Sequence, residues 1–155
     1  MHARSNHFVL HPGDVVIAER GDSIETLLGS CVTVILTDPR RTVGAVCHVV
    51  HTVSRPISSA ASVGSASVAF ACMDKGLRGK GIVASMCEAY VYGGGHMFPD
   101  RPDVRSVGDD NGAWVLGQLQ MMGVRLMEVD LGGSAYRKLK WTVGPSNPEV
   151  QHHRM

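Results

Sequence analysis

The chain has 155 residues, of which 44% are hydrophobic and 19% charged, and its formal net charge is +1. This composition is typical of a folded globular protein and excludes wholesale disorder, and the length is that of one domain. The small net charge gives no electrostatic basis for binding nucleic acid or for attraction to an anionic membrane.

Turn residues and β-branched segments divide the first third of the chain. Residues 1–11 are expected to be a loosely ordered or strand-like lead-in to a short buried strand at 15–18. Two further strands are predicted at 32–37 and 43–50, with Asp38-Pro39 as the turn between them. The similar length of the two arms predicts that they form a β-hairpin.

The rest of the chain contains two predicted helices. In chain order the predicted elements are a loop at 54–64, a helix at 65–77, a strand at 82–92, a loop at 99–102, a helix at 109–122, and strands at 124–129 and 136–143. Gly123 is the expected stop of the second helix, and residues 145–155 are expected to be loosely ordered. We therefore expect a single domain over residues 1–155 with an α+β fold, in which mixed and antiparallel β-sheets pack as a sandwich with two flanking helices.

A cysteine and a histidine on neighbouring strands suggest nucleophilic chemistry. Cys31 follows the small residues Gly29 and Ser30, and His48 lies on the predicted partner strand. An imidazole can take the thiol proton and leave a reactive thiolate, and the backbone N–H groups of a sharp turn can hold an oxyanion. The alternative for Cys31 is a small buried hydrophobic residue.

The strand register decides whether Cys31 and His48 can meet. Pairing near the open end of the hairpin would place the two side chains on adjacent strands within reach of each other. A slip of one residue would put them on opposite faces of the sheet. Cys72 and Cys87 lie in apolar segments and are expected to be part of the core.

Several blocks of the sequence, in family order, resemble the chemoreceptor glutamine deamidase family (CheD). They cover about residues 12–150: Thr26-Leu27-Leu28-Gly29-Ser30-Cys31-Val32-Thr33-Val34, Val43-Gly44-Ala45-Val46-Cys47-His48, Tyr92-Gly93-Gly94-Gly95-His96-Met97-Phe98, Val107-Gly108-Asp109-Asp110-Asn111, Asp130-Leu131-Gly132-Gly133 and Arg137-Lys138-Leu139. Where the family often has His-Phe-x-Leu-Pro and an Arg-Tyr-x-Asp stretch, this chain has different residues after His48.

The resemblance implies hydrolytic deamidation of glutamine side chains on bacterial chemoreceptors, in chemotaxis adaptation. Cys31 would be the nucleophile, His48 the base, and the backbone around Gly29 and Ser30 the oxyanion site. Some members carry a threonine six residues before the cysteine, where this chain has Glu25, so the neighbouring Thr26 is the favoured partner of His48 and Glu25 the alternative.

The resemblance also implies partners: the cytoplasmic helices of the receptor and, in organisms that have it, the phosphatase CheC. It implies no cofactor. Two alternatives stay open, a receptor-binding module without turnover and a cysteine hydrolase acting on another amide.

The remaining patterns favour neither a metal site nor a membrane segment. Cys47 and His48 are neighbours on a strand and point to opposite faces, and His51 and His96 are interpreted as surface or loop residues. No segment approaches the ~20 apolar residues of a membrane span, and the N-terminus lacks the apolar core of a signal peptide. We expect a cytoplasmic protein without membrane insertion, whose four cysteines are reduced.

Overall fold

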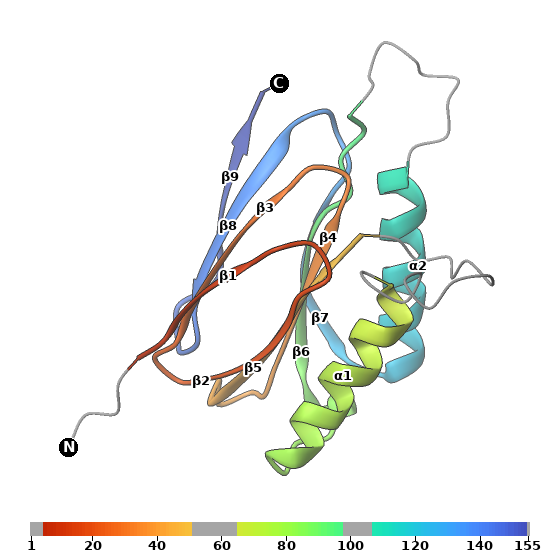
Figure 1. Cartoon of the computed structure of the whole chain (residues 1–155). Helices are drawn as coiled ribbons and strands as arrows, with labels where there is room; N and C mark the ends of the chain where they lie inside the picture. Colours follow the sequence, from red (N-terminus) through yellow and green to blue (C-terminus); the bar gives the residue numbers. More distant parts are fainter. Residues whose placement is uncertain (1–4, 51–64, 98–106, 155) are drawn as a thin grey trace.

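The computed structural model describes residues 5–50, 65–97 and 107–154 (Figure 1). In chain order its elements are β1 (His7–Leu10), β2 (Val15–Glu19), β3 (Ser23–Leu28), β4 (Val32–Thr37), β5 (Val43–Val49), α1 (Ala66–Gly79), the 3₁₀-helix η2 (Ala84–Met86), β6 (Glu88–Gly93), α2 (Val107–Met122), β7 (Arg125–Leu131), β8 (Tyr136–Thr142) and β9 (Glu149–His153). The predicted loops at 54–64 and 99–102, and also His51, lie outside the described residues.

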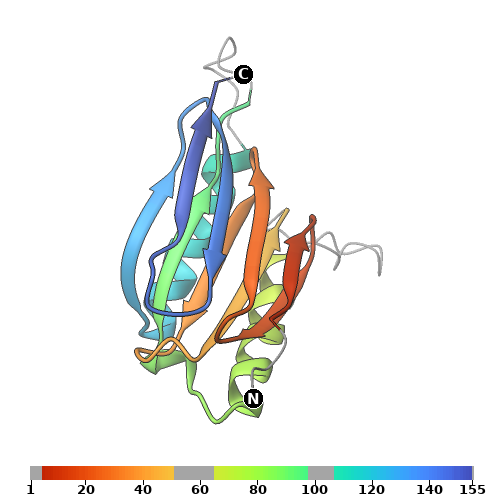
Figure 2. The ribbon, with the colours of Figure 1, turned by 90° about the vertical axis from the view of Figure 1, so that its left-hand side faces the viewer.

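The strands form two sheets that pack face to face. One sheet has the order β1-β3-β8-β9 and the other the order β2-β5-β4-β6-β7, and each contains one parallel pair. Helices α1 and α2 cover the outer face of the five-stranded sheet (Figure 1), and the turned view shows the four-stranded sheet in front of it (Figure 2). The predicted α+β sandwich with two flanking helices is confirmed.

Strand β4 lies at the centre of the five-stranded sheet, and every one of its residues is buried. Val34 and Leu36 belong to the core beneath the helices, whereas Ile35 belongs to the core between the two sheets. A strand buried on both faces needs apolar or β-branched residues at successive positions, which explains the uninterrupted run from Val32 to Thr37. The predicted strand at 32–37 and its hairpin with β5 are confirmed.

Both terminal segments contain strands. The prediction of a loosely ordered end was wrong at Glu149–His153, whereas His7–Leu10 follows the strand-like alternative for the lead-in. β1 pairs in parallel with β3, and β9 pairs antiparallel with β8. Four- and five-residue segments carry too little periodicity to be recognised in sequence, and long-range pairing with a neighbouring strand orders them instead. The N-terminal strand proves important because β1 reaches the candidate site described below.

The predicted strands at 124–129 and 136–143 are confirmed as β7 and β8, which belong to different sheets, so the chain passes from one layer to the other at Gly132-Gly133. Two further expectations need correction. The first part of the predicted strand at 82–92 contains the 3₁₀-helix η2, and the strand itself starts only at Glu88. Cys72 is exposed on α1, whereas Cys87 is buried as expected.

No helix in the described part of the chain is long and apolar enough to cross a membrane.

Candidate active site

The register of the β4–β5 hairpin places Cys31 and His48 on the same face. Thr33 is directly opposite His48, and Cys31 lies two positions before Thr33 on the same strand path. Side chains two apart share a face, and diagonal partners on antiparallel strands have Cβ atoms within roughly 7–8 Å of each other. This face points towards the four-stranded sheet, whereas Cys47 points into the core beneath the helices. The structure thus places the predicted cysteine and histidine on the same face of the five-stranded sheet, towards the other sheet.

A hydrogen-bond chain from the other sheet holds the imidazole of His48. The hydroxyl of Thr26 on β3 lies 2.8 Å from His48 Nδ1 and 2.8 Å from the carbonyl oxygen of Leu10 on β1. A hydroxyl has one proton to donate, so both contacts are satisfied when His48 Nδ1–H donates to Thr26 and Thr26 donates to Leu10. In this tautomer Nε2 keeps its lone pair, which is the state a general base needs.

Glu25 is not part of this chain of contacts. Neighbours on a strand face opposite ways, and the Glu25 carboxylate lies 3.1 Å from His7 Nε2 on the outer side of the four-stranded sheet. The hydrogen bond from His7 lowers the pKa of Glu25, and the other ring nitrogen of His7 lies 2.6 Å from the hydroxyl of Ser23. Of the two predicted partners of His48, the structure places Thr26, and not Glu25, against the imidazole.

Thr26→Val, which keeps the shape and removes the hydroxyl, is expected to lower turnover about tenfold or more, because the imidazole loses the group that fixes its ring and tautomer. Thr26→Ser should restore most of the rate, and Glu25→Gln should leave it unchanged. Steady-state kinetics on the three purified variants provide the measurement. If Glu25→Gln were the slower enzyme, the orienting role would belong to the carboxylate.

All three carbonyl groups of the turn before β4 accept hydrogen bonds. The backbone N–H of Gly95 donates to Gly29 and that of Gly94 donates to Cys31, each over 2.9 Å. The amide of Asn111 at the start of α2 donates to the carbonyl of Ser30 over 3.2 Å. These bonds fix the backbone of the nucleophile turn through its carbonyl groups.

Two glycines allow the backbones around this turn to come close. Gly93 has a φ of 115°, and a Cβ there would lie 2.2 Å from the carbonyl oxygen of Cys31. A Cβ on Gly108, in the first turn of α2, would lie 2.4 Å from the carbonyl oxygen of Gly95. The glycine-rich segment after β6 is therefore packed between the nucleophile turn and α2, where no larger residue fits.

Gly93→Ala should destabilise the protein far more than a glycine replacement elsewhere, because it combines a positive φ with a backbone clash. We expect a loss of about 2 kcal/mol or more, or at least about 4 °C in the melting temperature. Gly81→Ala is the matched control, since Gly81 has a φ of 76° and a Cβ added there would meet nothing within 4 Å. Equal melting temperatures for the two variants would show that the contact of the added Cβ with Cys31 does not destabilise the protein.

Burial shifts both members of the cysteine–histidine pair towards their neutral forms. Cys31 is half-buried, and desolvation raises the pKa of its thiol. Burial lowers the pKa of His48, an effect that the Leu10 carbonyl and the Asp14 carboxylate partly offset. Both shifts favour a thiol and a neutral imidazole in the resting protein at neutral pH.

Two residues near the site have contacts that sequence reasoning did not assign. Leu10 contributes only a backbone carbonyl, which no side-chain pattern reveals. Asn111 was visible in the Gly-x-x-Asn block, but its contact with the nucleophile turn depends on the packing of α2. His96 donates its backbone N–H to the carbonyl of Gly133 over 2.7 Å.

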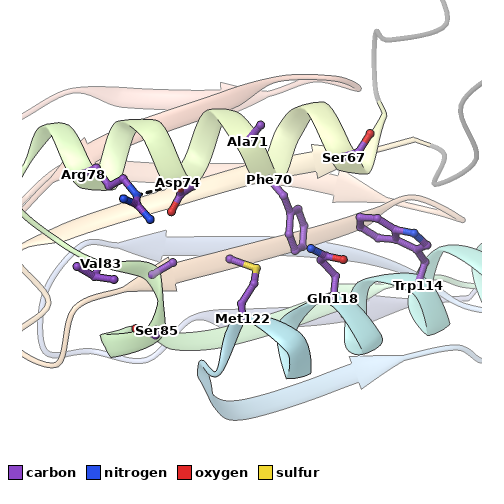
Figure 3. Close-up of a pocket in the computed structure, with 11 residues that line it drawn as sticks. Ser67, Phe70, Ala71, Asp74, Arg78, Val83, Ser85, Trp114, Gln118 and Met122 are labelled. Carbon is purple, nitrogen blue, oxygen red and sulfur yellow. Dashed lines mark hydrogen bonds and ion pairs between the residues drawn. The ribbon is translucent and has the colours of Figure 1, made fainter.

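The described cavities lie away from this pair. One of about 580 Å³ lies between α1, η2 and α2, with Phe70, Trp114 and Met122 pointing into it (Figure 3). It is on the outer face of the five-stranded sheet, whereas Cys31 and His48 face the inner side. Within the described residues, no three His, Cys, Asp or Glu side chains are grouped so that they could hold a metal ion.

A half-buried thiol, an imidazole with a fixed tautomer and a rigid turn with backbone N–H donors are the parts that cysteine hydrolases use on amides. The fold and this arrangement therefore define the class of protein as a candidate cysteine hydrolase on an α+β sandwich. Comparison with known proteins narrows that class to one family.

The family model described as "CheD chemotactic sensory transduction" matches residues 54–152. A "Probable chemoreceptor glutamine deamidase CheD 2" from Albidiferax ferrireducens is 32% identical over 94% of this chain and 86% of its own length. A "Probable chemoreceptor glutamine deamidase CheD" from Pseudomonas syringae is 29% identical over 95% of this chain and 85% of its own length. One from Methanococcus maripaludis is 32% identical over 82% of each chain. The chain belongs to the CheD family.

Proposed function

We propose that this protein hydrolyses the side-chain amide of specific glutamines on chemoreceptors, which yields glutamate and ammonia. The observation that carries the proposal is the Leu10–Thr26–His48 hydrogen-bond chain on the sheet face that Cys31 shares, in a chain whose relatives are named chemoreceptor glutamine deamidases. The geometry supports a nucleophile and a base, and the family supplies the substrate class.

In the first half of the reaction, the Cys31 thiol attacks the amide carbon while His48 Nε2 takes the thiol proton. The imidazolium that forms is stabilised by the Thr26 hydroxyl at Nδ1–H. The carbonyl oxygen becomes an oxyanion, which the backbone N–H groups of Ser30 and Cys31 would hold. His48 then returns its proton to the leaving nitrogen, ammonia departs, and a thioester on Cys31 remains.

In the second half of the reaction, a water molecule hydrolyses the thioester. His48 takes a proton from the water as it attacks the thioester carbon, and the proton then passes to the departing Cys31 sulfur. The products are a glutamate side chain and the free thiol. These steps require a nucleophile, a base and oxyanion donors, and each is assigned to a residue of this chain.

The proposal is tested by co-expressing a chemoreceptor cytoplasmic domain with the wild-type protein or with its Cys31→Ala variant. Intact-mass and peptide-level mass spectrometry should show glutamine-to-glutamate conversion at defined sites with the wild type only. Cleavage of the receptor chain would instead indicate a protease, and an effect on receptor signalling that survives in the variant would indicate a binding module.

The substrate segment is proposed to be the helical cytoplasmic region of the receptor, which would place the enzyme in the cytoplasm. The phosphatase CheC is a further partner expected from the family. Co-purification of a tagged form of this protein from its own organism would test that partner separately from the reaction.

The pH dependence follows from the direction of the shift at His48. Burial lowers the pKa of His48 from the ordinary value of 6.5. We therefore expect kcat/KM to rise with pH and then level off, and the midpoint of the rise should lie below pH 6.5. The same burial means that stability contributed by the neutral imidazole is present above pH 6.5 and is lost as pH falls towards the lowered pKa. Initial rates between pH 4.5 and pH 8, with unfolding measured in parallel, check this. A midpoint above pH 6.5 would contradict it.

A further inference from the structure

The side-chain amide of Asn111 connects the two strand ends that carry the candidate nucleophile and base. Asn111 is the fifth residue of α2 and is 1% exposed. Its Nδ2 lies 3.2 Å from the carbonyl oxygen of Ser30 and 3.0 Å from that of Val50. Ser30 directly precedes Cys31, and Val50 is two residues after His48. One side chain therefore contacts both ends of the hairpin.

The contact occurs where the sheet ladder has ended. The last paired residues of β4 and β5 are Val32 and Val49, so Ser30 and Val50 lie just beyond the ladder. Buried carbonyl groups need hydrogen-bond donors, and strand ends without ladder bonds separate easily. The primary amide of asparagine has two N–H groups, one for each carbonyl, so it continues the connection between the strands past their last pair.

We infer that Asn111 is a positioning residue that sets the separation of the Cys31 thiol and the His48 imidazole. Proton transfer and attack depend steeply on this geometry, and a displacement of about 1 Å can cost about 100-fold in rate. The inference rests on the proposed function for the reaction that it assists, but the alignment of thiol and imidazole can also be measured without a receptor substrate.

The surrounding contacts separate this role from a purely structural one. The carbonyl groups of Gly29 and Cys31 are held by the backbone N–H groups of Gly95 and Gly94, and these bonds remain in any Asn111 variant. Loss of the amide should therefore leave the turn folded and loosen only its connection to β5. We expect a change in chemistry that is larger than the change in stability.

Three variants in a Cys72→Ser background provide the test, since Cys72 is exposed and would otherwise react with thiol reagents. Asn111→Ala removes the amide. Asn111→Asp keeps the shape but directs a carboxylate at two carbonyl oxygens. Asn111→Gln keeps the amide on a longer side chain. Gln120→Ala, at an exposed position on the same helix, is the matched control.

Asn111→Ala and Asn111→Asp are expected to lower kcat by about 10- to 100-fold, with KM for the receptor within about twofold of wild type. Asn111→Gln should lose less of the rate than the other two Asn111 variants, and Gln120→Ala should keep the wild-type rate. The second readout is alkylation of Cys31 by iodoacetamide as a function of pH. In the wild type the rate should rise as His48 loses its proton, and this rise should disappear in Asn111→Asp.

Folded Asn111→Ala and Asn111→Asp proteins with wild-type kcat and a wild-type alkylation profile would overturn the inference. So would loss of the folded state in all three variants, since that would assign Asn111 to fold stability alone. If the wild type does not deamidate the receptor, the proposed function fails, and the alkylation profiles still decide the role of Asn111.

Discussion

Cys31→Ala is expected to abolish deamidation, with a loss of at least about four orders of magnitude in kcat. The reason is chemical: without the thiol no thioester can form, and neither His48 nor the turn can attack an amide carbon. Cys31→Ser should be similarly inactive, because a neutral imidazole activates a serine hydroxyl in this site far less readily than a thiol. The measurement is the rate of glutamine-to-glutamate conversion in a receptor fragment, followed by mass spectrometry.

Both variants should remain folded. Cys31 lies at the edge of the core between the sheets and is only partly buried there. Its replacement by a residue of similar size should therefore change the melting temperature little. Cys72→Ser is the matched control because it removes an exposed thiol far from the site. A Cys31→Ala protein that converts receptor glutamines at the normal rate would remove the central claim.

His48→Ala is expected to lower kcat by about 10²- to 10⁴-fold, the range associated with loss of a general base. KM should change much less, because the imidazole acts in proton transfer. His48→Gln offers a variant with a polar side chain of similar size that can still contact Thr26, so that loss of activity can be separated from loss of packing. Kinetics on both variants, together with thermal unfolding, provide the data.

The pH profile adds a check on the His48 variants. The ascending limb below pH 6.5 should vanish in both, because the group responsible for it is gone. His152→Ala is a suitable control, since this half-exposed imidazole pairs at 2.7 Å with Asp130, which lies on β7, three strands away from the strand of His48. A loss in His152→Ala as large as that in His48→Ala would show that the base had been wrongly chosen.

The hairpin could be predicted from sequence because it depends on local rules: the β-branched run of β4, the turn at Asp38-Pro39 and the matching length of β5. Its register was left open, because a slip of one residue was equally compatible with these signals. The observed pairing of Thr33 with His48 settles it and puts Cys31 on the same face as the imidazole. The two helices were found for the same reason: small residues in α1, and acids followed by a terminating Gly123 in α2.

The strand at the C-terminal end was missed, and the one at the N-terminal end was left open between a loose and a strand-like segment, because the order of both comes from long-range partners. β1 is four residues long and pairs with β3 across a separation of 16 residues, and β9 depends on β8. Cys72 was misplaced for a related reason. Its apolar neighbours in sequence lie on different sides of α1, and only the packing of that helix decided which side faced the sheet.

The sequence by itself determined the residue types of the candidate site, because a thiol, an imidazole and a small-residue turn are recognisable wherever they occur. The tertiary structure alone decided between Thr26 and Glu25. Those two neighbours face opposite sides of β3, and the stacking of one sheet on the other puts Thr26 2.8 Å from His48 Nδ1 while Glu25 faces His7. The tertiary structure also decided the contacts of Leu10 and Asn111. The backbone carbonyl of Leu10 comes from the other sheet and the amide of Asn111 from a covering helix, so both reach their partners only after the layers have packed.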